Sequence, residues 1–350
     1  MSSLRNSALL GLAAALHAAA ATPATLAEPS ADRWMYPSNS TPGSRGQAST
    51  FSALPETAGV EDRWGFFLVG FDTSALVPAG LPPQSYRIRS VVLRATIGQD
   101  GTFHYDPTED PLASYATADR AASVADPDPG RPVELHGAGF RNDFTAATFT
   151  ETSPYGFPER NAYPLGFDEA GGPRDVSWNV TGQFEARPWA VGRSDAVEPG
   201  APVPAETAFT FDIDPSPPGV GDYLRQSLAD GWLWLSLDSL HPAVQQGGEL
   251  ASWLTRDDAV HQIFGGLAPQ LALEVELDIP LEMQGAPGSL TLAWPVSAGL
   301  TYELQATPDL AEPSWETVHV HEASTDGSGS HTDTATATRR FYRLQITPTP

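Results

Sequence analysis

The stretch that decides the fold is Gly65-Phe66-Phe67-Leu68-Val69-Gly70-Phe71-Asp72-Thr73-Ser74. In a strand, Phe67, Val69 and Phe71 share one face, while Phe66 and Leu68 share the other. Apolar residues on both faces predict a strand that is covered on both sides. We therefore expect this segment to be the central strand of a β-sandwich.

A second strand is predicted for the stretch Ile88-Arg89-Ser90-Val91-Val92-Leu93-Arg94-Ala95. Its apolar residues alternate with polar ones, which predicts a half-buried strand. The connection 77–83 contains three prolines, and proline cannot continue a β-ladder. We expect the two stretches to form paired strands on either side of this connection.

The composition favours short strands joined by turns, because the 350 residues include 33 Pro and 31 Gly. Alternating patterns predict further strands, and Asp222 and Gly231 bound one short helix. Residues 131–170 are interpreted as a loop-rich insertion. The expected strands lie at 33–36, 102–105, 175–180, 209–213, 232–237 and 271–279, and the helix lies at 222–230.

The fold class predicted from these patterns is all-β, with two domains. Residues 28–280 are expected to form a jelly-roll-like β-sandwich with long loops and one short helix. Residues 281–350 show shorter alternating segments that suit a small sandwich of the immunoglobulin or fibronectin III kind. Its strands are expected at 290–294, 302–306, 316–320 and 342–346, with a flexible turn at 324–330.

The amino terminus resembles a secretory signal peptide. Arg5 precedes the apolar run 8–16, and Thr25-Leu26-Ala27 provides small residues at a cleavage site. We therefore assign residues 1–27 to a cleaved signal peptide. This predicts a protein that is secreted or associated with the cell surface, without insertion into the membrane.

Charge is the most one-sided property of the chain. Asp and Glu total 43 against 19 basic residues, all of them Arg, which gives a formal charge of −24. Nucleic acids and anionic lipids are poor partners for such a chain, because binding a polyanion depends on clustered cations. Solubility, or adaptation to a salty medium, is the simplest explanation of the acidity.

Divalent cations are the more specific explanation. Asp126 and Asp128 lie in the run Asp-Pro-Asp-Pro-Gly and offer the hard oxygen ligands that calcium prefers. Asp212 and Asp214 offer the same chemistry, but they also suit the solvent face of a strand. A structural calcium ion on Asp126 and Asp128 is the only cofactor that the sequence suggests, since the absence of cysteine leaves no thiolate ligands.

A family resemblance is carried by spaced patches between residues 31 and 278. They are Ala31-Asp32 and the segments FFLVGFDTSALVP, IRSVVLRATI, DVSWNVT, DGWLWLSL, SWLTRDDA and APQLALEV. Together they resemble the bacterial extracellular modules called DNRLRE or disaggregatase-related domains. The resemblance implies a jelly-roll sandwich, and some relatives act as carbohydrate-binding modules, including alginate-directed ones. No residue of the family's binding surface can be matched here by motif.

The carboxyl-terminal part resembles a second module. The segments LTLAWPVSAGLTYELQATPDL and RRFYRLQI, with Trp315 between them, are similar to a module of secreted planctomycete and verrucomicrobial proteins. This resemblance implies a fibronectin III-like accessory sandwich with no chemistry of its own.

Standard catalytic motifs are missing from the sequence, including the G-x-S-x-G elbow and the His-Glu-x-x-His pair. His104, Tyr105 and Asp106 form the first trio to consider for a lyase, and His136, His241 and His261 are the other histidines to consider. A glycosidase would need two carboxyls at a defined separation, and sequence alone cannot nominate them. We therefore expect a protein that is not an enzyme.

Aromatic residues near arginines provide the candidate ligand site, because sugar rings stack on aromatic faces. Arg33 precedes Trp34, Arg63 precedes Trp64, and Arg187 lies close to Trp189. The same aromatic residues are equally suited to a core. The ligand-binding candidates are Arg33, Trp34, Tyr36, Arg63, Trp64, Arg187, Trp189 and Trp253.

The predicted function is that of an exported, non-catalytic protein that binds extracellular polysaccharide, an anionic polymer being one option. A structural or matrix protein of the cell envelope is the alternative from another class. A polysaccharide lyase or hydrolase is a third.

Overall fold

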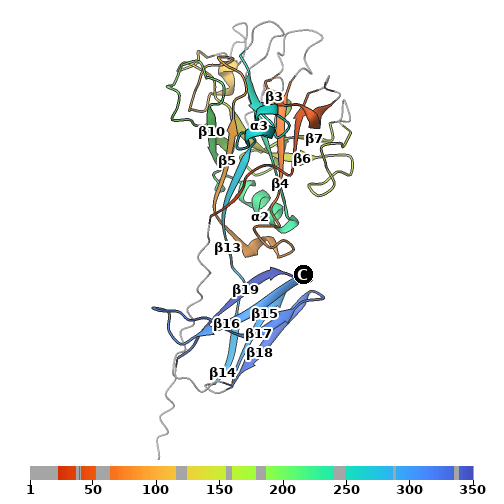
Figure 1. Cartoon of the computed structure of the whole chain (residues 1–350), viewed down its shortest axis with the longest axis vertical. Helices are drawn as coiled ribbons and strands as arrows, with labels where there is room; N and C mark the ends of the chain where they lie inside the picture. The colour runs from red at the N-terminus through yellow and green to blue at the C-terminus, as the bar shows by residue number, and fades with distance from the viewer. Residues whose placement is uncertain are drawn as a thin grey trace, which may run out of the picture. The chain divides into compact units, whose positions relative to one another are not determined.

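The computed structural model describes residues 23–36, 39, 41–52, 64–115, 124–154, 160–178, 187–239, 249–286, 289–334 and 339–349. Over these residues the chain is an all-β sandwich protein with short helices, as the sequence predicts (Figure 1). One compact unit spans Thr22–Val275, and a second contains Glu276–Pro350. The predicted domain boundary is at residue 280. Residues 1–22 of the predicted signal peptide, residues 1–27, lie outside the described residues.

The larger unit is built from two main antiparallel sheets and one short ladder. The first sheet has the order β1 (Ala24–Leu26), β13 (Gln270–Leu277), β5 (Tyr86–Thr96) and β10 (Ala208–Asp212). The second has the order β2 (Ala31–Met35), β4 (Phe66–Asp72), β11 (Trp232–Asp238), β6 (Glu134–Phe140), β7 (Ala162–Phe167) and β8 (Pro173–Asp175), with β9 (Ala190–Val191) beside β6. The short ladder joins β3 (Gln47–Thr50) and β12 (Ala251–Leu254).

Strand β4 has the central, doubly covered position that its sequence predicts. Residues 66–71 are all buried, and β4 lies between β2 and β11. Phe66 and Leu68 belong to a core cluster that includes Trp234 of β11 and Phe149, which lies between β6 and β7. The 140–150 segment therefore covers one face of β4, which explains why this strand carries apolar residues on both faces.

The expected pairing of the two opening stretches is wrong. Strand β5 is half-buried as predicted, but it pairs with β10, whereas β4 pairs with β2 and β11. The proline-containing connection is too long and irregular for a tight hairpin, so the chain crosses from one sheet to the other. Tyr86 fixes this crossing, because its hydroxyl donates to the Pro78 carbonyl at 2.7 Å.

Helix α2 (Val220–Asp230) corresponds to the predicted helix. It begins two residues earlier than expected, after Gly219, and it ends at Gly231, whose φ is 77°. Leu224 and Leu228 are buried, and the helix contacts both β11 and β5. A second helix, α3 (Ala259–Phe264), is missing from the prediction. Asp258 caps it by accepting hydrogen bonds from two backbone amides.

Several predicted and observed elements differ for local reasons. Of the predicted strand 102–105, only His104 and Tyr105 form isolated bridges, and 176–178 form a 3₁₀ turn. Strands β6 and β7 lie within the segment interpreted as loop. In β6, Gly137 and Gly139 interrupt the apolar alternation, and they lie beneath the rings of Trp189 and Tyr163.

The smaller unit contains two three-stranded antiparallel sheets. One is β14 (Glu282–Ala286), β15 (Ser289–Val296) and β18 (Gly327–Asp333), and the other is β17 (Glu316–Glu322), β16 (Leu300–Thr307) and β19 (Phe341–Pro348). Trp294, Tyr302 and Leu304 are buried in its core. Strand β18 occupies part of the segment predicted as a flexible turn. Its pairing with β15 places Gly329 against the Trp294 ring.

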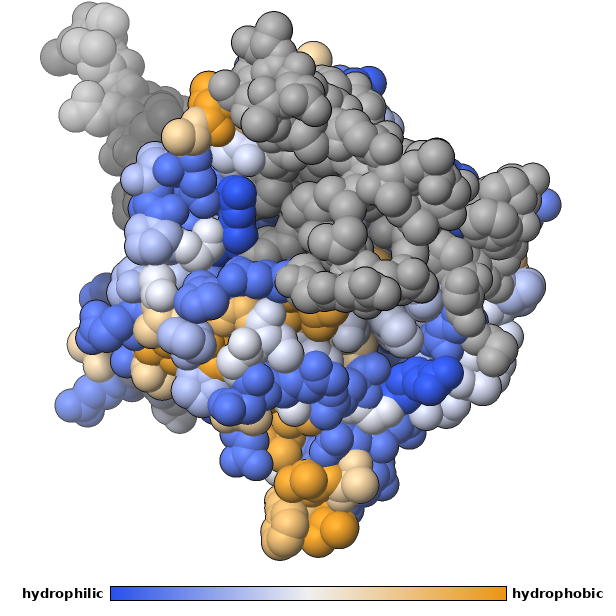
Figure 2. Space-filling model, turned by 90° about the horizontal axis from the view of Figure 1, so that it is seen from above, coloured by the Kyte–Doolittle hydropathy of each residue, from blue (hydrophilic) through white to orange (hydrophobic). Residues whose placement is uncertain are grey.

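Hydrophilic residues cover most of the coloured surface in Figure 2, and apolar residues gather in small patches. Ile263 and Phe264 of α3 are among the exposed large hydrophobic residues. Across the described segments, we find no helix with the length and apolar character needed to cross a membrane.

Candidate functional site

A hollow surface at one side of the larger unit is the best candidate site. Two neighbouring hollows, of about 660 and 740 Å³, share Glu109, Arg187, Pro188, Trp189 and Pro217. We call their combined lining the acidic groove; it consists of Glu134 and residues from segments 107–112, 167–169, 187–193 and 210–220. Both volumes fall in the range of small-molecule sites.

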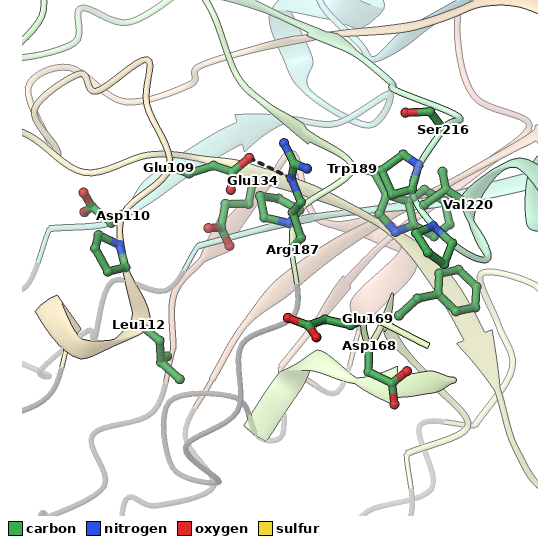
Figure 3. Close-up of a pocket in the computed structure, with 15 residues that line it drawn as sticks. Glu109, Asp110, Leu112, Glu134, Asp168, Glu169, Arg187, Trp189, Ser216 and Val220 are labelled. Atoms are coloured by element: carbon green, nitrogen blue, oxygen red, sulfur yellow. Dashed lines mark hydrogen bonds and ion pairs between the residues drawn. The ribbon is translucent and has the colours of Figure 1, made fainter. Parts of the chain in front are cut away.

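Turns with fixed geometry hold the walls of the acidic groove. At the β7–β8 turn, Asp168 Oδ1 accepts hydrogen bonds from the backbone amides of Ala170 and Gly172, at 3.1 and 2.8 Å. Gly171 has a φ of 81°, a left-handed conformation that glycine adopts without strain. This turn presents Glu169 at its tip, and Figure 3 shows Glu169 reaching into the groove while Asp168 turns away.

Glu134 of β6 is the most unusual group in the groove. Its side chain lines the hollow, but the residue is only 3% exposed. Burial is the main cause that raises the pKa of Glu134, to about 7, and His136 opposes this effect. The carboxylates of Asp238, Glu109 and Asp110 raise it further. Within the described part of the chain, no group donates a hydrogen bond to the Glu134 carboxyl.

Arg187 is the cation that lines both hollows of the groove, whereas Arg193 lines only one of them. The Arg187 Nε lies 3.4 Å from Glu109 Oε1, and the Arg187 side chain is 69% exposed. The dashed line in Figure 3 marks this pair. An exposed ion pair of this kind contributes little stability, so Arg187 and Glu109 can exchange partners at small cost.

Trp189 lines the groove through only part of its ring. Phe167 stacks on it with centroids 5.9 Å apart, and a Cβ at Gly137 would overlap the ring from below. Tyr223 contacts it edge-on. Because both faces are covered, Trp189 cannot offer the stacking platform that the sequence analysis predicts for it.

The remaining aromatic candidates do not join this site. Trp64 and Trp253 are buried, the first beneath the Arg160 guanidinium at 3.5 Å and the second between Phe209 and Phe211. Trp34 and Tyr36 are half-buried and stack on each other with centroids 5.0 Å apart.

The predicted pairing of neighbouring arginines and tryptophans is also absent at Trp34. Arg33 is buried and donates to the carbonyls of Thr150 and Ser153, at 2.8 and 2.6 Å. It lies over the Phe149 ring instead of beside Trp34. Successive residues of a strand point to opposite faces, which separates the two side chains. Arg63 lies outside the described residues.

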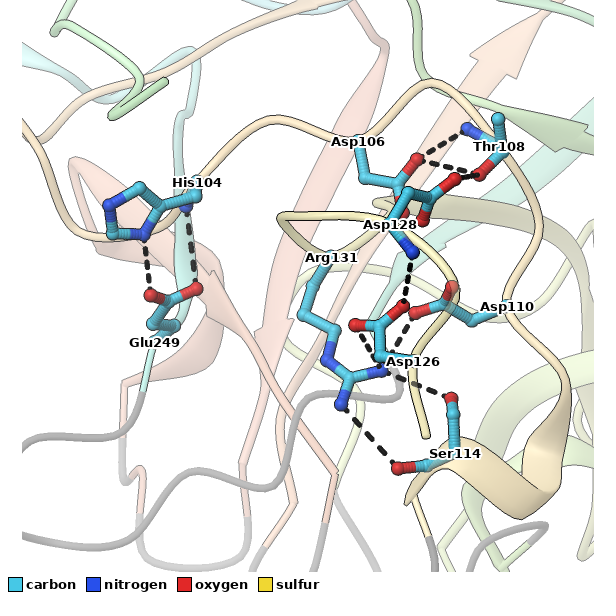
Figure 4. A network of polar contacts seen from close by, with 9 residues as sticks. All are labelled: His104, Asp106, Thr108, Asp110, Ser114, Asp126, Asp128, Arg131 and Glu249. Atoms are coloured by element: carbon cyan, nitrogen blue, oxygen red, sulfur yellow. Dashed lines mark hydrogen bonds and ion pairs between the residues drawn. The ribbon is translucent and has the colours of Figure 1, made fainter. Parts of the chain in front are cut away.

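An acidic cluster adjoins the groove. Asp106, Asp110 and Asp128 each offer a carboxylate oxygen, and these oxygens lie within 4.8 Å of one another (Figure 4). Burial raises the pKa of Asp106, and no hydrogen bond reaches its Oδ2. The geometry suits a hard cation such as calcium.

The calcium ligands predicted from the sequence are only partly brought together. Asp128 belongs to the acidic cluster, but Asp126 pairs with Arg131 at 3.2 Å. Arg131 also holds Asp110 at 2.8 Å. The pattern missed Asp106 and Asp110, whose Asp-Pro dipeptides are repeated at 106–107 and 110–111 in the same segment.

The trio proposed for a lyase diverges. His104 Nδ1 lies 2.6 Å from Glu249, whereas the buried Tyr105 hydroxyl accepts from the Ser194 amide. Asp106 turns toward Thr108 and Asp128 (Figure 4). These three side chains therefore do not face a common space in which a substrate could react.

No family model and no curated protein matches this chain.

Proposed function

We propose that this is an exported protein that binds an extracellular polysaccharide in the acidic groove. The observation that carries the proposal is Glu134, a buried carboxyl without a hydrogen-bond donor among the described residues that lines an open hollow. Carboxylates accept hydrogen bonds from sugar hydroxyls, and the prolines beside them provide apolar contact with sugar C–H groups. The same carboxylates repel phosphate, which disfavours a nucleic acid.

Retention on polysaccharide matrices tests this proposal. We expect the full chain to bind at least one member of a broad glycan panel, and Glu134→Gln or Glu169→Gln to weaken that binding. Glu198→Gln is the matched control, since Glu198 is exposed in the same unit and lines neither hollow. Failure of every glycan to bind, or equal binding by all three variants, would contradict the proposal.

Hydrolysis of the bound polysaccharide is a second candidate function, favoured by the pairing of Glu134 and Glu169 in one groove. Burial raises the pKa of Glu134 to about 7, so a large share of these carboxyls carries a proton at neutral pH, which suits a general acid. Glu169 is exposed and suits a base that takes a proton from water. Water would then add to the anomeric carbon while Glu134 protonates the departing oxygen. Release of new reducing ends, lost in both variants, distinguishes cleavage from binding alone.

A further inference from the structure

The charges lining one of the two hollows of the acidic groove are unbalanced. Five acidic residues contribute to the lining of the hollow that contains Glu134, namely Glu109, Asp110, Glu134, Asp168 and Glu169. Arg187 is the one cation among the described residues that line it. A ligand entering this hollow therefore meets a field that attracts positive charge and repels negative charge.

Three of the five carboxyls already have partners from the protein. Glu109 faces Arg187, Asp110 faces Arg131, and Asp168 accepts from two amides of its own turn. Glu134 and Glu169 are left to interact with a ligand. Glu134 is more than nine-tenths buried, lines the hollow and receives no hydrogen bond from the described residues, so a donor in the groove would satisfy it.

We propose, on the basis of the polysaccharide-binding function above, that the acidic groove selects saccharides with free amino groups, as in glucosamine oligomers. An ammonium group carries several N–H donors and a positive charge, which matches two carboxyls better than a neutral hydroxyl does. A uronate polymer brings carboxylates next to Glu169, where like charges repel, and it offers Glu134 neither a positive charge nor the N–H donors of an ammonium group. The anionic ligand suggested by the sequence is therefore the least suited to this groove.

Isothermal titration of the full chain with three saccharide probes tests the inference. The probes are a β-1,4-linked glucosamine hexamer, its fully N-acetylated counterpart and an oligouronate, at pH 7 and about 150 mM salt. We expect the glucosamine hexamer to bind about tenfold tighter than the acetylated hexamer, and the oligouronate not to bind. Glu134→Gln and Glu169→Gln should each remove most of this preference, while Glu198→Gln should keep it.

Each alternative outcome has a distinct meaning. Equal affinity for the two hexamers overturns the amine preference but keeps polysaccharide binding, whereas no binding by any saccharide overturns both. A preference that survives in Glu169→Gln and Glu134→Gln places the amine elsewhere on this acidic protein and overturns the inference. Because Glu169 is exposed, its variant remains informative even if Glu134→Gln fails to fold. Binding of spermine as tightly as the glucosamine hexamer would overturn it too, because charge alone, without the saccharide, would then be recognised.

Discussion

The protonation of one buried side chain, Glu134, links the stability of this protein to pH. Its pKa is about 7 in the folded chain, against an ordinary value of 4.5, because burial disfavours the charged carboxylate. The folded state therefore holds this proton more tightly than the unfolded state. The stabilising contribution is fully present below about pH 4.5 and is lost as the pH rises through about 7.

Replacing Glu134 with glutamine should remove this pH dependence, since the amide stays neutral. The quantity to compare is the free energy of unfolding of Glu134→Gln minus that of the unmodified protein. We expect this difference to increase by about 1–3 kcal/mol from pH 5 to pH 8, because only the unmodified protein loses the contribution of Glu134. Urea denaturation at several pH values measures the difference. The pKa of Asp32 is also raised, but Asp32 is present in both proteins and its effect cancels. A difference that stays constant with pH would contradict the prediction.

At the scale of single elements, the glycines of β6 place this strand against the groove. Gly137 lies so close to the Trp189 ring that an added Cβ would overlap it. We expect Gly137→Ala to displace Trp189 and to lower the free energy of unfolding by about 1–3 kcal/mol. Thermal unfolding followed by tryptophan fluorescence checks this expectation.

A strand glycine with open space around it is the control for that change. Gly327 of β18 has no neighbouring atom within reach of a Cβ. Gly327→Ala should therefore leave the melting temperature nearly unchanged. If the two variants melt alike, crowding under Trp189 is not the reason for glycine at position 137.

Because of strand β1, the position of amino-terminal cleavage should affect the stability of the protein. Ala24, Thr25 and Leu26 pair with Leu273, Ala272 and Leu271 of β13, in that order. Removing residues 1–27, the predicted signal peptide, would delete this strand and expose the edge of β13. The comparison is between a chain that starts at Pro23 and one that starts at Glu28. We expect the shorter chain to melt a few degrees lower, and equal melting temperatures would show that β1 contributes nothing.

Strands with regular alternation were predictable from the sequence, and strands defined by their partners were not. The alternating apolar residues of β13 and the two apolar faces of β4 identify both elements. Strand β18, GSGSHTD, has no apolar side chain, and its pairing with β15 defines it. Such a strand depends on contacts that are distant in sequence, which local patterns do not record.

On the scale of the whole molecule, the acidic groove shows why the candidate site was harder to predict than the fold. Its walls come from segments that are about 100 residues apart in the sequence. Arg187 and Trp189 were identified because they are neighbours along the chain. Glu134 was missed because its burial, and not its sequence context, makes it unusual among 43 acidic residues.

The formal charge of −24 complicates any test for a specific cation. Self-repulsion destabilises a compact chain of high net charge, so every added salt screens it and stabilises the fold. A calcium site must therefore be distinguished from general screening. Comparison of calcium with magnesium and sodium at equal ionic strength achieves this, because screening depends on ionic strength and coordination depends on the ion.

Under those matched conditions, we expect calcium to raise the melting temperature more than magnesium or sodium does. Calcium would neutralise the clustered carboxylates of Asp106, Asp110 and Asp128, and a ligand that binds only the folded state stabilises it. Asp106→Asn should remove the calcium-specific increment and keep the response to sodium, since asparagine retains an oxygen that can accept the Thr108 hydrogen bonds. Glu198→Gln, with the same loss of one charge, should retain both responses. If calcium, magnesium and sodium give the same increment, the cluster is balanced by protons and by Arg131, without a bound metal.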